Sequence, residues 1–112
     1  MKNIKEIIDK SYLNNTELNE GLKAIGVSKN HLVELFKREY SVTPMKYINT
    51  LRIEKAQELL LTSDRSILDI ALSSGFGNLS SFYEAFRKKN SMTPKDYRKT
   101  LIKNNNIEVE EK

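Results

Sequence analysis

Residues 86–97 read FRKKNSMTPKDY, and residues 36–47 read FKREYSVTPMKY. The two stretches lie fifty positions apart and carry Phe, a basic pair, Ser, Thr-Pro and Tyr in the same order. A resemblance at a fixed interval within one chain is typical of a structural unit that occurs twice. We therefore expect two copies of one unit within the 112 residues.

The resemblance continues upstream of both stretches. Leu32 aligns with Phe82 at an offset of 50, and Gly26 aligns with Gly75 at an offset of 49. The second turn, GFGN, is therefore one residue longer than the first, GVS. A short helix, a tight turn containing Gly and a second helix form the helix-turn-helix layout, and in each copy a third helix follows from Thr-Pro.

The spacing of apolar residues predicts helices nearly throughout the chain, because no long stretch alternates with period two. A first amphipathic helix is outlined by Ile4, Ile7, Ile8 and Leu13. The starts of four later helices are marked by side chains that can accept a hydrogen bond from the first turn: Thr16, Ser28, Ser66 and Asn78.

Thr-Pro occurs at 43–44 and at 93–94, where it places a capping hydroxyl before a proline at the first helical position. No helix breaker follows the first pair until Ser63, so we expect one long helix over residues 44–61, about 27 Å long at 1.5 Å per residue. The second pair starts a short seventh helix. The expected fold class is all-α, with two homeodomain-like helix-turn-helix subdomains joined by the long central helix.

We expect a single domain over residues 1–103. Subdomain one covers about 3–43 and subdomain two about 64–100, on either side of the linking helix at 44–61. Residues 104–112 carry three Glu against one Lys after a run of Asn, which predicts a disordered acidic tail.

Positive charge is concentrated towards the C-terminus. Residues 1–84 carry 11 basic and 11 acidic side chains, whereas residues 85–103 carry seven basic side chains against Asp96. A basic block in an otherwise balanced chain favours contact with a polyanion, although a solvated helix face can have the same composition.

The composition excludes several classes of site. Without Cys the chain has no disulfide framework, no Cys-ligated zinc and no thiol nucleophile. His31 is the only histidine and the carboxylates are scattered, so we expect no metal, no cofactor and no enzyme active site. No apolar run approaches the roughly 20 residues of a membrane span and the N-terminus is no signal peptide, so we expect a cytoplasmic protein without membrane contact.

In a helix-turn-helix unit the outer face of the second helix is free to enter a DNA major groove. In the first copy this face carries Lys29, Asn30, His31, Val33, Glu34, Lys37 and Arg38. In the second copy it carries Leu79, Ser80, Ser81, Tyr83, Glu84, Arg87 and Lys88. A basic pair comes last in both copies, which suits base contacts near the helix start and phosphate contacts near its end.

Over residues of roughly 5–100 the sequence resembles the AraC/XylS-type transcription regulators. The resemblance is carried by GVSKNHLVELFKREYSVTPMKYINTLRIEKAQELL (26–60) and, more specifically, by SILDIALSSGFGNLSSFYEAFRKKNSMTPKDYR (66–98). It implies a bacterial seven-helix domain whose two reading helices enter adjacent major-groove segments on one face of the duplex. It also implies control of transcription, usually by activation through contact with RNA polymerase.

The resemblance places base-reading positions at Asn30, Val33 and Glu34 in the first copy and at Ser80, Ser81 and Glu84 in the second, with Tyr83 adjacent. Candidate phosphate contacts are Lys29, His31, Lys37, Arg38, Asn78, Arg87 and Lys88. Glu34 and Glu84 depart from the family, whose members often have a donor such as Arg there. Either both glutamates accept a hydrogen bond from cytosine, or they pair within the protein, as Glu34 can with Arg38.

Double-stranded DNA and, by resemblance alone, RNA polymerase are the expected partners. The chain is either a small stand-alone regulator or the C-terminal domain of a larger one, and an effector is expected only with a separate domain. We expect a monomer, because no heptad seam or spare apolar face is visible. The alternative function is a helical protein-interaction module that binds no DNA.

Three residues outside the reading helices have expected structural roles. Tyr47 and Tyr97 follow Thr-Pro at the same interval, so we expect each to pack the third helix of its unit onto the other two. Arg52 lies on the long helix and is expected to tie it to a subdomain rather than to read DNA.

Overall fold

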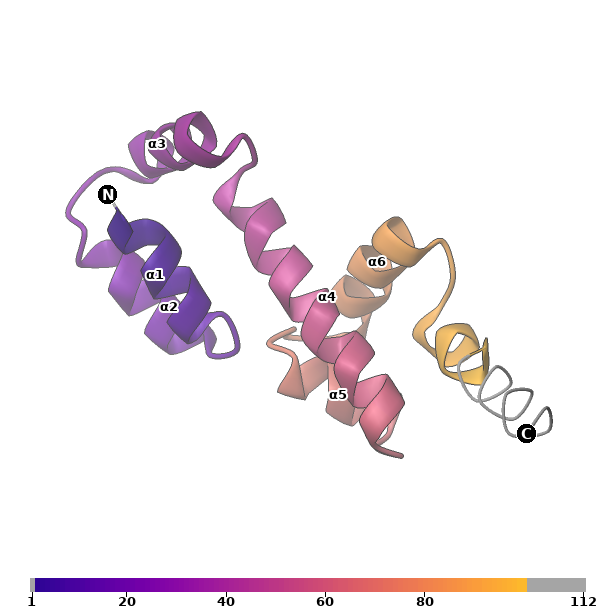
Figure 1. Ribbon diagram of the computed structural model, residues 1–112. Coiled ribbons are helices and arrows are strands. Elements are labelled where there is room, and N and C mark those ends of the chain that lie inside the picture. The colour runs from indigo at the N-terminus through magenta and orange to yellow at the C-terminus, as the bar shows by residue number, and fades with distance from the viewer. Residues whose placement is uncertain (1, 101–112) are drawn as a thin grey trace. The chain divides into compact units, whose positions relative to one another are not determined.

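The computed structural model describes residues 2–100, so the acidic tail expected at 104–112 lies outside the described part. Six helices are followed by a seventh, which begins at Pro94 and reaches the last described residue. The six are α1 (Lys2–Ser11), α2 (Asn15–Lys23), α3 (Lys29–Tyr40), α4 (Pro44–Thr62), α5 (Ile67–Ser73) and α6 (Leu79–Asn90), as labelled in Figure 1. The described residues contain no strand, which confirms the all-α fold class.

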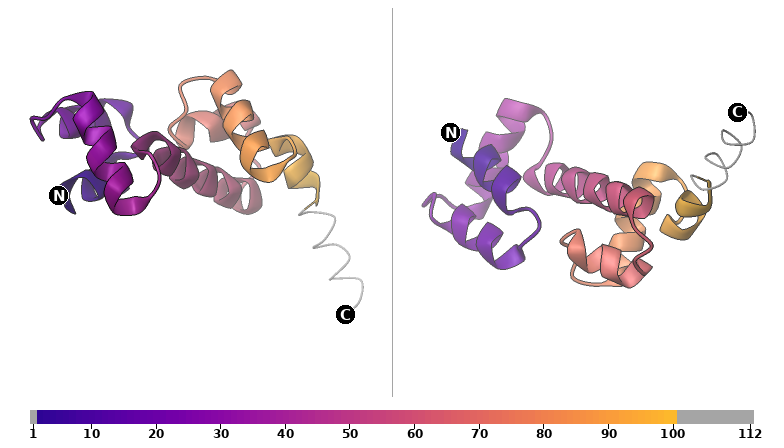
Figure 2. Two further views of the ribbon diagram at one scale, coloured as in Figure 1. Left: turned by 90° about the horizontal axis from the view of Figure 1, so that it is seen from above. Right: turned by 60° about the horizontal axis from the view of Figure 1, so that its bottom comes forward.

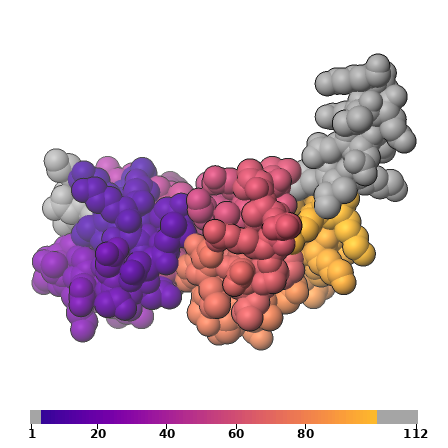
Figure 3. Space-filling model, turned by 90° about the horizontal axis from the view of Figure 1, so that it is seen from below, coloured from indigo at the N-terminus to yellow at the C-terminus, as the bar shows by residue number. Residues whose placement is uncertain are grey.

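The chain forms two compact units, and the boundary between them falls between Arg52 and Ile53, within α4. In the first unit α1 and α2 lie side by side, and in the second α5 and α6 do so (Figures 1 and 2). Figure 3 shows that the end of α4, α5, α6 and the helix from Pro94 form one continuous surface in the second unit. Each unit buries its own apolar core, so α4 contributes to two separate cores.

The core of the first unit is formed by the inward faces of its helices and buries Ile4, Ile8, Leu18, Leu32, Phe36 and Ile48. Tyr47 packs against Phe36, with ring centroids 5.6 Å apart, and its hydroxyl donates a hydrogen bond to Asp9 of α1. Burial, reinforced by this hydrogen bond, raises the pKa of Tyr47. The expected packing role of Tyr47 is confirmed.

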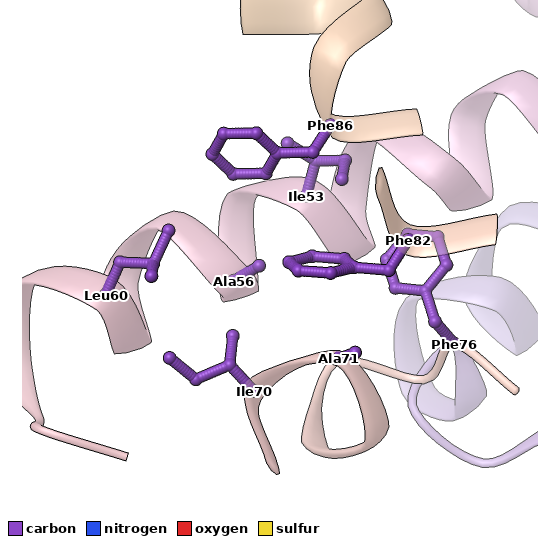
Figure 4. Close-up of a cluster of buried hydrophobic side chains, with 8 residues drawn as sticks. All are labelled: Ile53, Ala56, Leu60, Ile70, Ala71, Phe76, Phe82 and Phe86. Carbon is purple, nitrogen blue, oxygen red and sulfur yellow. The ribbon is translucent and has the colours of Figure 1, made fainter. Parts of the chain in front are cut away.

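The core of the second unit is drawn in Figure 4 and buries Ile53, Ala56, Leu60, Ile70, Ala71, Phe76, Phe82 and Phe86. Tyr97 packs edge-on against Phe86, with ring centroids 5.3 Å apart, and its hydroxyl accepts a hydrogen bond from Gln57 at 3.0 Å. The packing role of Tyr97 is therefore confirmed too. The tyrosine hydroxyls differ in their partners, because the first unit supplies a carboxylate and the second a neutral amide.

Most of the helix starts agree with the sequence. Ser28 accepts from the backbone N–H of His31 at 3.1 Å and Ser66 from that of Asp69 at 3.0 Å. Thr43 accepts from the backbone N–H of residue 46, and Thr93 from that of residue 96, which confirms both Thr-Pro starts. These caps satisfy backbone donors that have no partner within the helix.

Two sequence-based predictions in the first unit are wrong. Asn14, not Thr16, caps α2, and its side chain accepts from the backbone N–H of Glu17 at 3.0 Å. Asn ranks above Thr as a capping residue, so the earlier of the two positions starts the helix. Leu13 is 41% exposed rather than inward, because α1 ends at Ser11 and the helical spacing stops there.

Both turns before Thr-Pro contain a serine in the left-handed region. Ser41 has φ 66° and Ser91 has φ 58°, and they are equivalent positions of the repeat. Each donates its backbone N–H to a carbonyl of the last helical turn, from Ser41 to Lys37 and from Ser91 to Arg87, at 2.8 Å in both cases. Gly26 and Gly75 have positive φ as well, which agrees with their place in the tight turns.

Arg52 on α4 and Arg98 on the helix from Pro94 each donate to oxygen atoms near the end of an earlier helix, α1 and α4 respectively. Arg52 is 7% exposed and donates to the carbonyl of Tyr12 and the side-chain oxygen of Asn15, at 2.8 Å each. Arg98 donates to the carbonyls of residues 60, 63 and 65, at 3.4, 3.0 and 2.8 Å. The tying role predicted for Arg52 is confirmed, and burial lowers its pKa.

We expect Arg98→Ala to destabilise the protein by about 1–3 kcal/mol, because carbonyls in the last turn of α4 and just beyond it lose a charged donor. The measurement is urea unfolding followed by circular dichroism. Lys99→Ala, at an exposed neighbouring position of the same helix, is the matched control. Equal unfolding midpoints for the two variants would contradict the role assigned to Arg98.

Candidate nucleic-acid interface

The second helix of each helix-turn-helix pair, α3 or α6, turns the same positions inward. Leu32 and Phe36 are buried in α3, and Phe82 and Phe86 are buried in α6. From residue 30 to 40 and from 80 to 90, equivalent positions fall in the same class of exposure. The two helices therefore present the same face outward, each relative to its own core.

The outer face contains nearly all the positions expected to contact DNA. Of the expected positions in α3, the exposed ones are Lys29, Asn30, His31, Glu34, Lys37 and Arg38, and Val33 is half-buried. Of the expected positions in α6, the exposed ones are Ser80, Ser81, Glu84, Arg87 and Lys88, and Tyr83 is half-buried. Because a helix has 3.6 residues per turn, positions 30, 33, 34 and 37 share one face, as do their equivalents in α6.

One residue of α6 that was expected on the outer face, Leu79, packs partly against the core instead. Leu79 is half-buried and packs against the core of the second unit, whereas its equivalent Lys29 is exposed. The expectation that Leu79 lies on the outer face is wrong, because an apolar first residue gains more from the adjacent core than from water. The outer face of α6 therefore begins at Ser80.

Val33 and Tyr83 occupy equivalent positions, and each is half-buried. The ring centroid of Tyr83 lies 6.1 Å from that of Phe82, whose side chain is buried in the core. Such partly packed side chains can offer a defined apolar edge to a thymine methyl at low entropic cost.

Cations occupy the last turns of both helices. Lys37 and Arg38 lie in the last turn of α3, and Arg87 and Lys88 in that of α6. None of these four forms an ion pair with another described residue, in contrast to Lys89, whose ammonium lies 3.8 Å from a carboxylate oxygen of Glu54. The four cations therefore remain available for phosphate groups.

Glu34 and Glu84 are exposed at equivalent positions of the two outer faces. Within the described part of the chain neither forms an ion pair, so the pairing of Glu34 with Arg38 is not present. Each helix thus presents one uncompensated carboxylate between its polar first turn and its basic last turn.

The side chain of Asn78 caps α6 and accepts from the backbone N–H of Ser81 at 2.8 Å. Its amide oxygen is engaged in this way, while its NH₂ group is still able to donate. The residue lies at the positive end of the helix dipole, where an anion is favoured. A phosphate contact from Asn78 is compatible with its capping role.

The described residues contain no group of three or more His, Cys, Asp or Glu side chains placed to hold a metal ion. Among the same residues, no helix has both the length and the apolar character needed to cross a bilayer.

Two copies of a helix, a Gly turn and a second helix with an exposed polar face define a double helix-turn-helix DNA-binding fold. The family model described as a helix-turn-helix domain matches residues 22–100. The chain belongs to the AraC/XylS-type family of helix-turn-helix transcription regulators. The resemblance stated from the sequence is thereby confirmed, as is the expectation that the chain is not an enzyme.

Curated relatives extend this comparison. The chain is 35% identical over 94 residues to the HTH-type transcriptional regulator ExsA of Pseudomonas aeruginosa, across 84% of this chain and 34% of that protein. It is 31% identical over 99 residues to the virulence regulon transcriptional activator VirF of Yersinia enterocolitica, across 88% of this chain and 36% of that protein. The chain thus spans about a third of the length of these relatives.

Solved structures share the fold. The C-terminal domain of the two-component response regulator yesN from Fusobacterium nucleatum matches with a TM-score of 0.73 and 33% identity, over 85% of this chain and 93% of that one. The DNA-binding domain of AdpA, solved in complex with a target DNA, matches with a TM-score of 0.76, over 88% of this chain and 91% of that one. Its 22% identity makes it a likeness of fold alone.

We expect Asn78→Asp to separate capping from phosphate contact, because Asp also caps helices but repels a phosphate. The variant should keep the unfolding midpoint of the wild type and bind duplex DNA about tenfold more weakly, a difference of about 1.4 kcal/mol. Thermal unfolding and a gel-shift titration measure the two effects. Asn78→Ser, a neutral capping variant, is the control, and equal DNA affinity for both would exclude a nearby phosphate.

Proposed function

We propose that residues 1–103 act as one DNA-binding domain that regulates transcription by inserting α3 and α6 into adjacent major-groove segments of one duplex. The observation that carries the proposal is the equivalence of the two helices, whose exposure agrees position by position from 30 to 40 and from 80 to 90. A generic helical hairpin would have no reason to keep two polar outer faces in the same register.

Each outer face has residues that are proposed to contact bases and residues that are proposed to contact phosphates. Asn30 suits adenine, Val33 suits a thymine methyl, and Ser80 and Ser81 are short groups that can contact several bases. Lys29, His31, Lys37 and Arg38 in the first unit, with Asn78, Arg87 and Lys88 in the second, are the proposed phosphate contacts. We assign most of the affinity to the cations and most of the specificity to the residues before them.

The two units are proposed to bind with unequal strength. Glu39 follows Lys37 and Arg38 in α3, whereas Lys89 stands at the equivalent position in α6. Residues 85–103 also carry six more positive than negative charges. We therefore expect the second unit to supply the larger share of the salt-dependent affinity.

Activation through RNA polymerase is proposed by analogy with the family, and the relative VirF is named a transcriptional activator. The proposed setting is cytoplasmic, on double-stranded DNA, with the chain as a monomer. An effector response is proposed only for residues outside this chain, since the matched segments cover about a third of the relatives' length.

Random-site selection followed by footprinting tests the proposal. We expect two protected segments about one helical turn apart, centred about 10 base pairs from each other. Absence of any retardation of duplex DNA at low salt would favour the alternative, a helical protein-interaction module. A single protected segment would indicate that only one helix reads DNA.

We expect neutralisation of Arg87 and Lys88 to Gln to weaken binding to all duplex sequences alike. The slope of log K against log salt should become shallower by about 0.9 for each phosphate that the protein no longer neutralises. The matched control changes Lys10 and Lys23 to Gln, which removes the same charge from exposed positions of α1 and α2. A salt titration in which both double variants have the same slope would contradict the phosphate role of Arg87 and Lys88.

A further inference from the structure

The outer faces of α3 and α6 differ at every proposed base-reading position except one. Asn30, His31 and Val33 stand where α6 has Ser80, Ser81 and Tyr83, which are chemically different. At the next position both helices carry the same residue, Glu34 and Glu84. Because the flanking residues differ, the shared glutamate is not a consequence of two identical faces.

Each of these carboxylates lacks a partner within the described protein. Both are exposed, and neither lies in an ion pair with another described residue, although cations follow at the third and fourth positions along each helix. On a face directed at DNA, an uncompensated negative charge is repelled by the phosphates. Binding therefore requires a hydrogen-bond donor in the groove that compensates for this repulsion.

The major groove offers such a donor in a form that suits a carboxylate. Cytosine presents its N4 amino group, whereas adenine presents the acceptor N7 directly beside its N6 amino group. A carboxylate can only accept, so adenine N7 would repel it, while Asn and Gln can satisfy both adenine atoms. Guanine and thymine present oxygen or nitrogen acceptors, and thymine adds a methyl group.

We propose that Glu34 and Glu84 each read a cytosine, so that the operator has one cytosine contact in each of two otherwise different half-sites. This inference rests on the proposed function, because it assumes that α3 and α6 both enter the major groove. The neighbouring residues then distinguish the half-sites, through Asn30 and Val33 in the first and Ser80 and Tyr83 in the second.

Random-site selection with the wild type, Glu34→Gln and Glu84→Gln tests this assignment. Gln keeps the size and helix propensity of Glu but pairs with adenine, so each variant should change one cytosine to adenine in one half-site only. The preference for cytosine at that position should fall about tenfold or more. The other half-site should keep its cytosine, which shows that the two contacts are separate.

Glu39→Gln is the matched control. Glu39 is exposed in α3 and lies half a turn round the helix from Asn30, so the substitution removes the same charge away from the reading face. If Glu34→Gln and Glu84→Gln only tighten binding to all sequences, as this control should, the two glutamates are merely repelled and the inference is overturned. Selected sites without cytosine in the wild type would also overturn it.

The outcomes distinguish the inference from the function on which it rests. In one outcome the wild type binds selectively and protects two segments, but neither variant changes the base preference. This outcome refutes cytosine reading and leaves the proposed function standing. Failure of the wild type to bind duplex DNA at low salt refutes both.

Discussion

In each unit one pair of buried apolar side chains, here called the apolar seam, determines how the helices pack together. The pair is Leu32 and Phe36 in α3, and Phe82 and Phe86 in α6. A unit of a few short helices has little apolar surface to bury, so it is stable only if this seam faces the other helices. Once the seam is inward, the opposite side of the same helix must face water. The polar outer faces of α3 and α6 are therefore fixed by the cores beneath them, and side chains on these faces can change without loss of packing.

The long helix α4 belongs to two cores at once, which explains why no single apolar stripe runs along it. Ile48 is buried in the first core, whereas Ile53 and Leu60 are buried in the second. Arg52, at the boundary, donates to the end of the first helix in its unit, and Arg98 performs the same task in the other. The two arginines lie 46 positions apart rather than 50, and the difference of four residues is close to one helical turn. An equivalent contact is thus made from one turn of α4 and from a different turn of the helix that begins at Pro94.

Local features of the fold were predictable and long-range contacts were not. Ser28 and Asn78 cap their helices as expected, because capping depends on a residue type and on backbone atoms three positions away. The carbonyl contacts of Arg98 span more than thirty residues, and no local pattern marks them. The exposure of Glu34 and Glu84 follows from helical spacing, but the absence of an ionic partner among the described residues required the side-chain positions. Leu79 shows the same limit, since its aligned partner is Lys29 and only packing in the second unit distinguishes the two.

The two copies therefore share what faces inward and differ in what faces outward. Tyr47 and Tyr97 both pack on the last aromatic residue of the seam, yet one hydroxyl binds a carboxylate and the other an amide. A repeated unit can diverge in this way because packing constrains shape and apolarity, while the surface is constrained only by its partner. Where an outer position has remained the same in both copies, as at Glu34 and Glu84, packing gives no reason for the identity. A common chemical target in both half-sites explains the identity. Because a carboxylate only accepts hydrogen bonds, that target is a hydrogen-bond donor in the major groove.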